Sequence, residues 1–336
     1  MRLSTIAEWF VELLKVEVEE PGMRIAVTGG AGYIGSTLMR RLLRGGHTAI
    51  SIDNLTRGDY GPLRGLEGSM ELLVGDIRDL NLLMEVFQDV DAVIHLAAIP
   101  GLKACDENPE EAISVNIYGT QQVLRAVVEA GVPHIIFASS AAVYGAPRYL
   151  PVDEGHPLRP LNLYGVTKLA GERLVEAYHE NYGLDATILR FGNVYGVGLY
   201  TRWDTVIPKF VRQGLRGEPL TIYGDGHSSR DFVHVEDIVE AIILALRHGG
   251  GFETYNIGGE PMEVGRVAEI VCEEIEAATG RRVEVTHLPP RIGETKRIEY
   301  DITRIREHLN YKPRWSVRRG VRQLIDYALK GGVFEA

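Results

Sequence analysis

Short apolar runs and amphipathic segments alternate along the first half of the chain. Five runs have the continuous apolar character of buried strands, and they lie at residues 24–29, 48–53, 70–76, 91–97 and 134–140. Segments with apolar residues at helical spacing lie between them, at residues 33–46, 80–87 and 110–130. Strands that alternate with helices are joined by right-handed crossovers and pair in parallel. The pattern therefore predicts an α/β fold with a doubly wound parallel sheet.

The regular alternation ends about halfway along the chain. Residues 185–196 predict one more strand, and glycine- and proline-containing loops such as 223–232 and 287–296 follow it. We therefore expect a first domain over residues 23–183. The remainder, residues 184–336, predicts a smaller α+β lobe that is interleaved with the first domain.

The first 22 residues form an N-terminal extension. Its apolar residues recur at helical spacing, and Pro21 and Gly22 then interrupt the pattern. These apolar residues are Ile6, Phe10, Leu13 and Leu14. Residues 1–22 predict an appended helix, with a true start at Met23 as the alternative.

Charge and composition narrow the class of protein. The chain has 36 Lys and Arg against 46 Asp and Glu, a net charge of −10, and no basic block that would suit nucleic acid. No apolar stretch is long enough for a membrane span, and glutamates interrupt the N-terminal region where a signal peptide would need apolar residues. Cys105 and Cys272 lie far apart without a CxxC motif, which argues against a structural zinc site. We expect a cytoplasmic protein without a metal centre.

A glycine-rich turn follows the first predicted strand. The stretch AVTGGAGYIGS, residues 26–36, places Gly29, Gly32 and Gly35 three positions apart between that strand and a helix. Glycines there let backbone N–H groups approach a pyrophosphate at the positive end of the helix, which is the Rossmann-type arrangement for a dinucleotide. The spacing is GxxGxxG instead of the commoner GxGxxG, so a tight turn without a ligand is the alternative.

Two aspartates end the next two predicted strands. Asp53 lies where a carboxylate would bind the ribose hydroxyls of the dinucleotide and repel a 2′-phosphate, which favours NAD over NADP. The nearby Arg57 weakens that preference. Asp76 is placed to meet the adenine, with a turn cap as the alternative.

Tyr164 and Lys168 are the strongest candidates for chemistry. They are four residues apart on a predicted helix and so share one face, where an ammonium would lower the pKa of the phenol and make it a usable base. Ser140, at the end of the fifth predicted strand, would present its hydroxyl to the same reacting oxygen. Taken alone, a Tyr and Lys at this spacing would more often be surface residues.

With these motifs, the chain resembles the extended short-chain dehydrogenase/reductase family, in particular nucleotide-sugar 4-epimerases of the UDP-glucose 4-epimerase type. The resemblance runs from Met23 to about Ala328 through TGGAGYIGS, DNLTRG, GDIRD, HLAA, SSAAVYG, YGVTK, LRFGNVYG and SRDFVHVEDIVEAI. It implies an NAD-binding first domain and a second lobe that binds the nucleotide sugar. The residues implied to line NAD are Gly29, Gly32, Tyr33, Ile34 and Gly35 at the pyrophosphate, Asp53 and Asn54 at the ribose, Asp76 and Ile77 at the adenine, and Ala97 and Asn116 along the nicotinamide half. Tyr164 would be the base, Lys168 would bind the nicotinamide ribose, and Ser140 would polarise the sugar oxygen.

The residues after Ser140 separate the reactions found in the family. Dehydratases of the family resemble one another in an Asp-Glu pair there, and decarboxylases usually have a Glu just before VYG; this chain has Ala141 and Ala142. Without a carboxylate, elimination lacks its proton carriers, so epimerisation through a 4-keto sugar is favoured. A nucleotide-sugar reductase or dehydrogenase, and a non-catalytic NAD-responsive binding protein, are the competing hypotheses.

The resemblance also implies substrate residues in the second lobe. Arg230 and Arg291 match phosphate-binding positions and Asn193 matches a diphosphate contact, whereas His234 and His95 are expected to be structural. Ile298 matches a position beside the sugar, and its bulk favours an unsubstituted UDP-hexose. Arg202 would suit a uronic acid carboxylate, so UDP-glucuronate and UDP-N-acetylglucosamine stay open as substrates. Finally, the helices near 110–130 and 164–180 resemble those that form a homodimer interface in the family.

Overall fold

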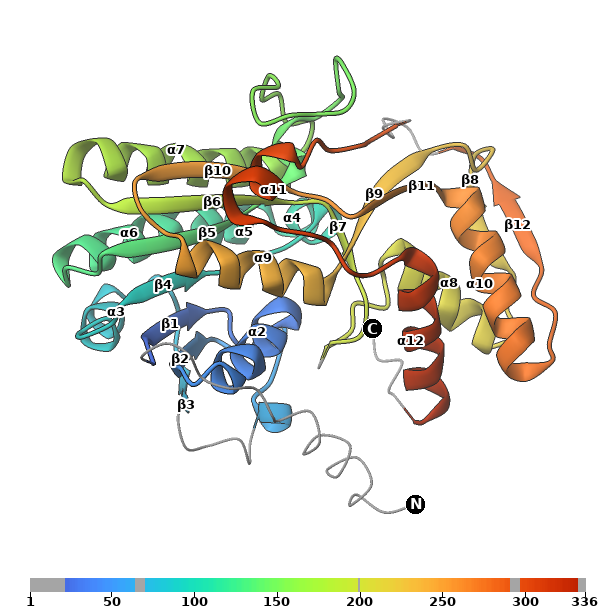
Figure 1. Ribbon diagram of the computed structural model, residues 1–336, viewed down its shortest axis with the longest axis horizontal. Helices are drawn as coiled ribbons and strands as arrows, with labels where there is room; N and C mark the ends of the chain where they lie inside the picture. Colours follow the sequence, from blue (N-terminus) through green and yellow to red (C-terminus); the bar gives the residue numbers. More distant parts are fainter. Residues whose placement is uncertain (1–21, 64–69, 199, 291–296, 332–336) are drawn as a thin grey trace.

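A parallel seven-stranded sheet forms the middle layer of the larger lobe (Figure 1). The computed structural model describes residues 22–63, 70–198, 200–290 and 297–331. The strands lie in the order β10-β6-β5-β4-β1-β2-β3, and every neighbouring pair is parallel. Their bounds are β1 Arg24–Thr28, β2 Thr48–Asp53, β3 Met70–Val74, β4 Ala92–His95, β5 His134–Ser140, β6 Asp185–Phe191 and β10 Phe252–Ile257. The predicted doubly wound, Rossmann-type parallel sheet is confirmed.

Helices cover both faces of this sheet. One face packs against α2 (Tyr33–Arg44), α9 (Val235–Arg247) and α11 (Thr303–Leu309), and the other against α3 (Leu80–Val86), α6 (Thr120–Glu129) and α7 (Leu163–Tyr182). Side chains alternate between the faces, so Ile25 and Val27 of β1 lie in one apolar cluster and Ala26 lies in the other. Because both faces of the sheet are buried, the strand sequences are apolar at nearly every position.

A smaller lobe is built from the later part of the chain. It contains a three-stranded sheet of β7 (Asn193–Tyr195), β9 (Ser229–His234) and β11 (Glu260–Glu263), and a pair of β8 (Leu220–Tyr223) and β12 (Val285–Leu288). Helices α8 (Val206–Leu215), α10 (Val264–Thr279) and α12 (Val317–Leu329) enclose its apolar core. The remaining elements are α4 (Leu102–Glu107), α5 (Pro109–Ile113), the π-helical η2 (Ser114–Gly119), and the short 3₁₀ turns η1 (Gly61–Leu63) and η3 (Ala141–Val143).

The structure differs from the predicted elements in three places. The strand expected over 185–196 is two strands, β6 and β7, which join different sheets; a Cβ on Gly192 between them would lie 3.2 Å from the carbonyl oxygens of Asp231 and Ile257. The helix expected over 110–130 contains the π-helical turn η2 between α5 and α6. The strand β10 was not predicted, and it adds a seventh strand beside β6. The predicted N-terminal helix lies outside the described residues, except for Gly22.

Among the described helices, none has the length and apolar character needed to cross a membrane.

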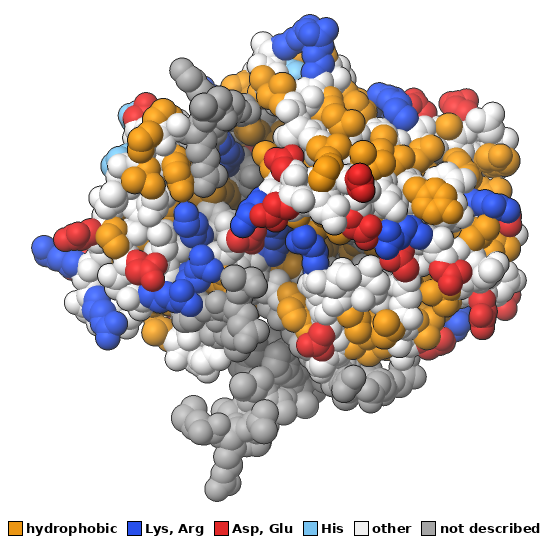
Figure 2. Space-filling view, turned by 180° about the vertical axis from the view of Figure 1, so that it is seen from behind, with side chains coloured by type: hydrophobic (Ala, Val, Ile, Leu, Met, Phe, Trp, Pro, Cys, Tyr) orange, Lys and Arg blue, Asp and Glu red, His pale blue; other side chains and the backbone are white. Residues whose placement is uncertain are grey.

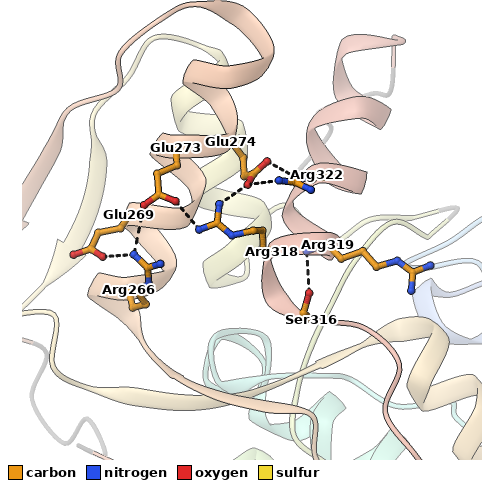
Figure 3. Close-up of polar contacts among 8 residues, drawn as sticks. All are labelled: Arg266, Glu269, Glu273, Glu274, Ser316, Arg318, Arg319 and Arg322. Atoms are coloured by element: carbon orange, nitrogen blue, oxygen red, sulfur yellow. Dashed lines mark hydrogen bonds and ion pairs between the residues drawn. The ribbon is translucent and has the colours of Figure 1, made fainter.

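An ion-pair cluster joins α10 to α12 in the smaller lobe (Figure 3). The side chain of Glu274 is only 7% exposed and accepts hydrogen bonds from Arg318 at 2.5 Å and from Arg322 at 2.5 and 3.2 Å. Arg318 also bonds Glu273, to which Arg266 extends the cluster. Glu274 is therefore the buried centre of this cluster.

We expect Glu274→Ala to lower the free energy of unfolding by about 1 kcal/mol, because the nearly buried carboxylate loses its hydrogen bonds while the two arginines stay accessible to water. The matched control is Glu269→Ala, at the exposed end of the same cluster, which we expect to change stability by less than about 0.5 kcal/mol. Thermal unfolding of both variants measures the difference. Equal effects of the two substitutions would contradict this description of the cluster.

Candidate active site

The predicted site residues gather at the carboxyl ends of the parallel strands. From β1 the chain runs to β2 and β3 on one side of the sheet, whereas β4, β5 and β6 lie on the other side. Such a switch point between two strands is where open α/β sheets bind ligands. The predicted residues lie at the ends of five of these strands. Asp53 and Ser140 are the last residues of β2 and β5, and Gly29, Asp76 and Ala97 come shortly after β1, β3 and β4.

The glycine-rich turn between β1 and α2 is shaped for close backbone approach. Gly29 has a φ of +77°, and a Cβ there would lie 2.7 Å from the backbone nitrogen of Ala97. A Cβ on Gly35 would collide with the carbonyl oxygen of Gly29. Gly32 is the N-cap of α2, which begins without a capping side chain and without an acidic residue in its first turn. The free backbone N–H groups at this end of α2 suit an anion, and binding of a pyrophosphate here stays a prediction.

Two further residues of this turn, Tyr33 and Ile34, begin α2. The hydroxyl of Tyr33 donates to the carbonyl of Gly196 in the smaller lobe at 2.8 Å, and Ile34 packs against the apolar cluster beneath α2. The Tyr33 side chain thus connects the turn to the other lobe.

Asp53 lies directly beside the glycine-rich turn. Its carboxylate accepts hydrogen bonds from the backbone nitrogens of Ala31 at 3.0 Å and Leu55 at 2.9 Å, while burial raises its pKa. Each oxygen keeps a further lone pair, so the carboxylate fits a pair of ribose hydroxyls. Asn54, the next residue, is exposed and donates to Asp76 at 3.3 Å.

Asp76 has a structural role in the loop after β3. A hydrogen-bonded fork from Arg78, at 2.8 and 2.7 Å, lowers the pKa of Asp76 to about 2, and the backbone nitrogen of Arg78 also donates to it at 2.9 Å. These hydrogen bonds give Asp76 the role of a turn cap, the alternative that the sequence also allowed. Ile77 is buried and packs against Gly119 of η2. A contact of Asp76 or Ile77 with adenine stays a prediction.

Asn116 ties two parts of the site together. It is buried in η2, where its amide accepts from the backbone nitrogen of Ile99 at 2.7 Å and donates to the Ile99 carbonyl at 3.1 Å and to Thr167 at 3.0 Å. Asn116 therefore links the loop after β4, through Ile99, to helix α7, through Thr167. Thr167 directly precedes Lys168. Asn116 was predicted to lie along the nicotinamide half of NAD. These hydrogen bonds do not test that contact, which stays a prediction.

Helix α7 presents Tyr164 and Lys168 to the end of β5. Asn162 caps the helix by accepting from the Gly165 nitrogen at 2.9 Å, and a Cβ on Gly165 would lie 2.6 Å from the carbonyl of Ala142. The helix can approach the η3 turn after β5 so closely only because Gly165 has no side chain. Lys168 is buried, and its ammonium donates to the carbonyl of Ala138 at 2.8 Å.

The charges around Tyr164 differ from the prediction. Burial raises the pKa of Tyr164, and a hydrogen bond with Ser140 and the charge of Arg202 act in the opposite direction. A lowered pKa was predicted, and this direction is wrong because burial outweighs the charges around the phenol; the Lys168 ammonium is directed at a backbone carbonyl. Burial also lowers the pKa of Lys168 to about 8. The charge of Arg202 thus acts on Tyr164, an effect that the sequence did not indicate.

The predicted substrate residues of the smaller lobe are placed as follows. Asn193 of β7 donates to the carbonyl of Asp231 at 3.3 Å, and Arg230 of the neighbouring strand β9 donates to the Ser229 carbonyl at 2.8 Å. Ile298 is partly buried against the apolar cluster that contains Ala141 and Tyr144. Arg291 lies outside the described residues.

The two histidines are structural, as predicted. His95 is buried between the hydroxyls of Thr28 at 2.7 Å and Thr120 at 3.0 Å, and burial lowers its pKa to about 3. His234 is stacked on Trp315 at 3.9 Å, and burial lowers its pKa to about 4. Both stay neutral near pH 7.

The fold and the site together define an NAD-binding enzyme of the Rossmann type. Residues 25–258 match the model of the NAD-dependent epimerase/dehydratase family, and the chain belongs to that family. It is 38% identical to the putative UDP-glucose 4-epimerase of Methanocaldococcus jannaschii, over 90% of this chain and 97% of that protein.

Solved structures agree with this assignment. The chain is similar to the UDP-glucose 4-epimerase of Thermotoga maritima with UDP-glucose, with a TM-score of 0.84, 31% identity and coverage of 92% and 99% of the two chains. It is also similar to the UDP-glucuronic acid 4-epimerase of Bacillus cereus in complex with UDP-glucuronic acid and NAD, with a TM-score of 0.83, 32% identity and coverage of 92% and 99%. NAD is the cofactor. Because the family contains both epimerases and dehydratases, the reaction type has to come from the site.

Proposed function

We propose that this enzyme epimerises C4 of a UDP-hexose, interconverting UDP-galactose and UDP-glucose through a transient 4-keto sugar. The observation that carries the proposal is the combination of Tyr164, Ser140 and Lys168 with an uncharged η3 turn. Ala141 and Ala142 follow Ser140 there, so this turn offers no carboxylate for eliminating water. A reaction that needs one base and a hydride acceptor suits these residues.

Each residue then has a definite task. The Tyr164 oxygen takes the proton of the C4 hydroxyl and later returns it, and the Ser140 hydroxyl holds the same sugar oxygen. Lys168, anchored by the Ala138 carbonyl, supplies a buried positive charge next to this pair. The glycine-rich turn and Asp53 would hold NAD, whose chemistry there would be reversible acceptance of the C4 hydride and a positive charge in its oxidised form.

Two hydrogen bonds near the glycine-rich turn support the retention of NAD between turnovers. Tyr33 bonds the carbonyl of Gly196, and Tyr200 donates to the carbonyl of Asp59 at 2.9 Å. These two bonds fasten the segment around Gly196 and Tyr200 to the turn that would hold the pyrophosphate and to the loop after β2. We infer that they slow the release of a cofactor held at this turn, which suits a reaction without net oxidation.

We assign the nucleotide and diphosphate of the substrate to the smaller lobe. Asn193 and Arg230 come from neighbouring strands of one sheet, and Arg291 follows in the chain. Guanidinium groups suit phosphate oxygens. Tight contacts to the nucleotide, with few to the hexose, would let the 4-keto sugar turn over while it stays bound.

The proposal is tested by supplying UDP-galactose to the purified protein without added NAD or NADH. Conversion to UDP-glucose is the expected result. A reductase or dehydrogenase would instead consume added NADH or NAD in proportion to product. A non-catalytic NAD-responsive protein would bind the cofactor and convert none of the sugars.

UDP-glucuronate is the second candidate substrate, and Arg202 is the observation that favours it. Its charge acts on Tyr164, so it lies close to the reacting position. However, Arg202 already pairs with Asp204 through bonds of 2.7 and 3.2 Å, and a substrate carboxylate would have to compete for it. A neutral hexose is therefore favoured. Comparing kcat/KM for UDP-galactose, UDP-glucuronate and UDP-N-acetylglucosamine decides among the three, and a preference for UDP-glucuronate that Arg202→Ala removes would replace our proposal.

We also propose a homodimer formed by the helical face of α5, η2, α6 and α7. Large apolar side chains are exposed there, including Ile113 at 47%, Tyr118 at 52% and Val166 at 46%. In Figure 2, hydrophobic side chains are spread over the half of the molecule that carries these helices. Contiguous exposed apolar surface favours association.

For this dimer, light scattering is expected to give twice the mass of one chain. Introducing charges with Tyr118→Asp and Val166→Asp together should reduce the mass to that of one chain, because both residues would be buried at the interface. Val74→Asp is the control, since Val74 is 67% exposed at the other end of the sheet. A monomeric unmodified protein would contradict the proposal.

A further inference from the structure

A buried ion pair lies directly behind the proposed catalytic residues. Glu172 follows Tyr164 and Lys168 on the same face of α7, each four residues after the last. Its carboxylate accepts a fork from Arg190 of β6, at 2.9 and 2.7 Å, and the side chains of both residues are almost fully buried, at 3% and 6% exposed. None of the proposed catalytic steps uses this pair.

The pair is connected to the active site through β5. Two successive residues of that strand bond α7: the Ala138 carbonyl accepts from Lys168, and the Ser139 hydroxyl donates to Glu172 at 2.5 Å. The next residue, Ser140, lies close enough to Tyr164 for its hydroxyl to lower the pKa of the phenol. Gly171 allows this fit, because a Cβ on it would lie 2.5 Å from the ring of Phe137. Glu172 therefore makes one of these two hydrogen bonds that join the helix to the strand.

On its other side, the pair is held by the rest of the fold. Arg190 also donates to the hydroxyl of Tyr144 at 2.9 Å and to the carbonyl of Glu154 at 3.2 Å. The Tyr144 hydroxyl in turn donates to the buried amide of Asn256 at 2.6 Å. Thus Arg190 of β6 is also held by Tyr144, which follows η3, and by the loop residue Glu154, so its position does not depend on Glu172 alone.

We propose that Glu172 is a positioning residue for this reaction: held by Arg190, it fixes Ser139 against α7 and so sets Ser140 and Lys168 relative to Tyr164, while its charge supports the Lys168 ammonium. The expected effect of Glu172 on turnover rests on the proposed function. Its effect on Lys168 is measurable without a substrate.

The charged and titratable groups around Lys168 are few. Cys105 of α4 and Glu172 favour its ammonium, burial opposes it, and the neutral His95 of β4 lies close by. Glu172 itself faces Arg190 and, across a cavity of about 300 Å³, shares a lining with Glu154, Arg173 and Glu176. Replacing Glu172 with Gln leaves Arg190 uncompensated, so one net positive charge is added near Lys168.

The first test is a side-chain NMR titration of Lys168, which is practical because the chain has only seven lysines. The signal is assigned by its loss in Lys168→Arg. We expect the midpoint near 8 in the unmodified protein and a fall of about one pH unit in Glu172→Gln. Glu172→Gln combined with Arg190→Gln removes both charges and should bring the midpoint back. Glu176→Gln, one turn further along α7 and exposed, is the control without a shift.

The second test separates position from charge. Ser139→Ala removes the bond to Glu172 and leaves the ion pair, so we expect the Lys168 midpoint to stay while kcat falls about tenfold with little change in KM. Glu172→Asp, which keeps the charge, should retain the wild-type midpoint and serves if Glu172→Gln does not fold. An unmoved midpoint in Glu172→Gln, or wild-type kcat in Ser139→Ala, would overturn the proposal. Absence of turnover in the unmodified protein with every UDP-sugar would instead count against the proposed function, since the titration needs no substrate.

Discussion

Tyr164→Phe is expected to lower kcat for interconversion of UDP-galactose and UDP-glucose by about 10²–10⁴-fold. The substitution removes the oxygen that takes the C4 proton and keeps the ring that packs at the start of α7. Bound NAD and the melting temperature should stay unchanged, because neither the glycine-rich turn nor the core is altered. The rate is measured with saturating UDP-galactose.

The control for this variant is Tyr182→Phe on the same helix. Tyr182 is 63% exposed at the far end of α7, so its hydroxyl has no part in the site. Unchanged turnover is expected for Tyr182→Phe. If Tyr164→Phe kept comparable activity, another group would have to be the base and the mechanism would be wrong.

Gly35→Ala should weaken NAD binding about 5- to 150-fold and so lower NAD occupancy, because overpacking at such a position costs roughly 1–3 kcal/mol. A Cβ on Gly35 would collide with the carbonyl of Gly29 and lie 2.7 Å from the Cα of Gly30, so the turn that receives the pyrophosphate must shift. Occupancy is read from the nucleotide released when the purified protein is denatured.

The matched substitution is Gly155→Ala, where the new Cβ would have only an ordinary contact of 3.4 Å with Asp153. NAD occupancy should be unchanged in that variant. Full occupancy in Gly35→Ala would mean that the turn between β1 and α2 does not hold the cofactor.

Much of the fold was predictable because strands buried on both faces have a simple sequence pattern. The run at 48–53 became β2 with the same bounds, and the runs at 24–29 and 134–140 became β1 and β5. The strand β10 was not predictable in this way, because three of its six residues are only partly buried and its place is set by pairing with β6.

Site residues were predictable where chemistry and local spacing coincide, as for Tyr164 and Lys168 on one helix. The direction of the Lys168 ammonium was not, because it depends on a carbonyl of β5, thirty residues earlier in the chain. The pairing of Glu172 with Arg190 likewise joins α7 to β6. Glu172 had a local signal, its spacing of four from Lys168, but its partner is visible only in three dimensions.

The central claim is that NAD is kept and regenerated within each turnover, and one measurement tests it directly. UDP-galactose is incubated with the purified enzyme without added cofactor, and both the sugars and the protein-bound nucleotide are then quantified. The account predicts a mixture of UDP-glucose and UDP-galactose from either starting sugar, many turnovers per enzyme, and bound nucleotide that is still NAD. Product formation only when NADH or NAD is added, with equivalent consumption of it, would contradict the account.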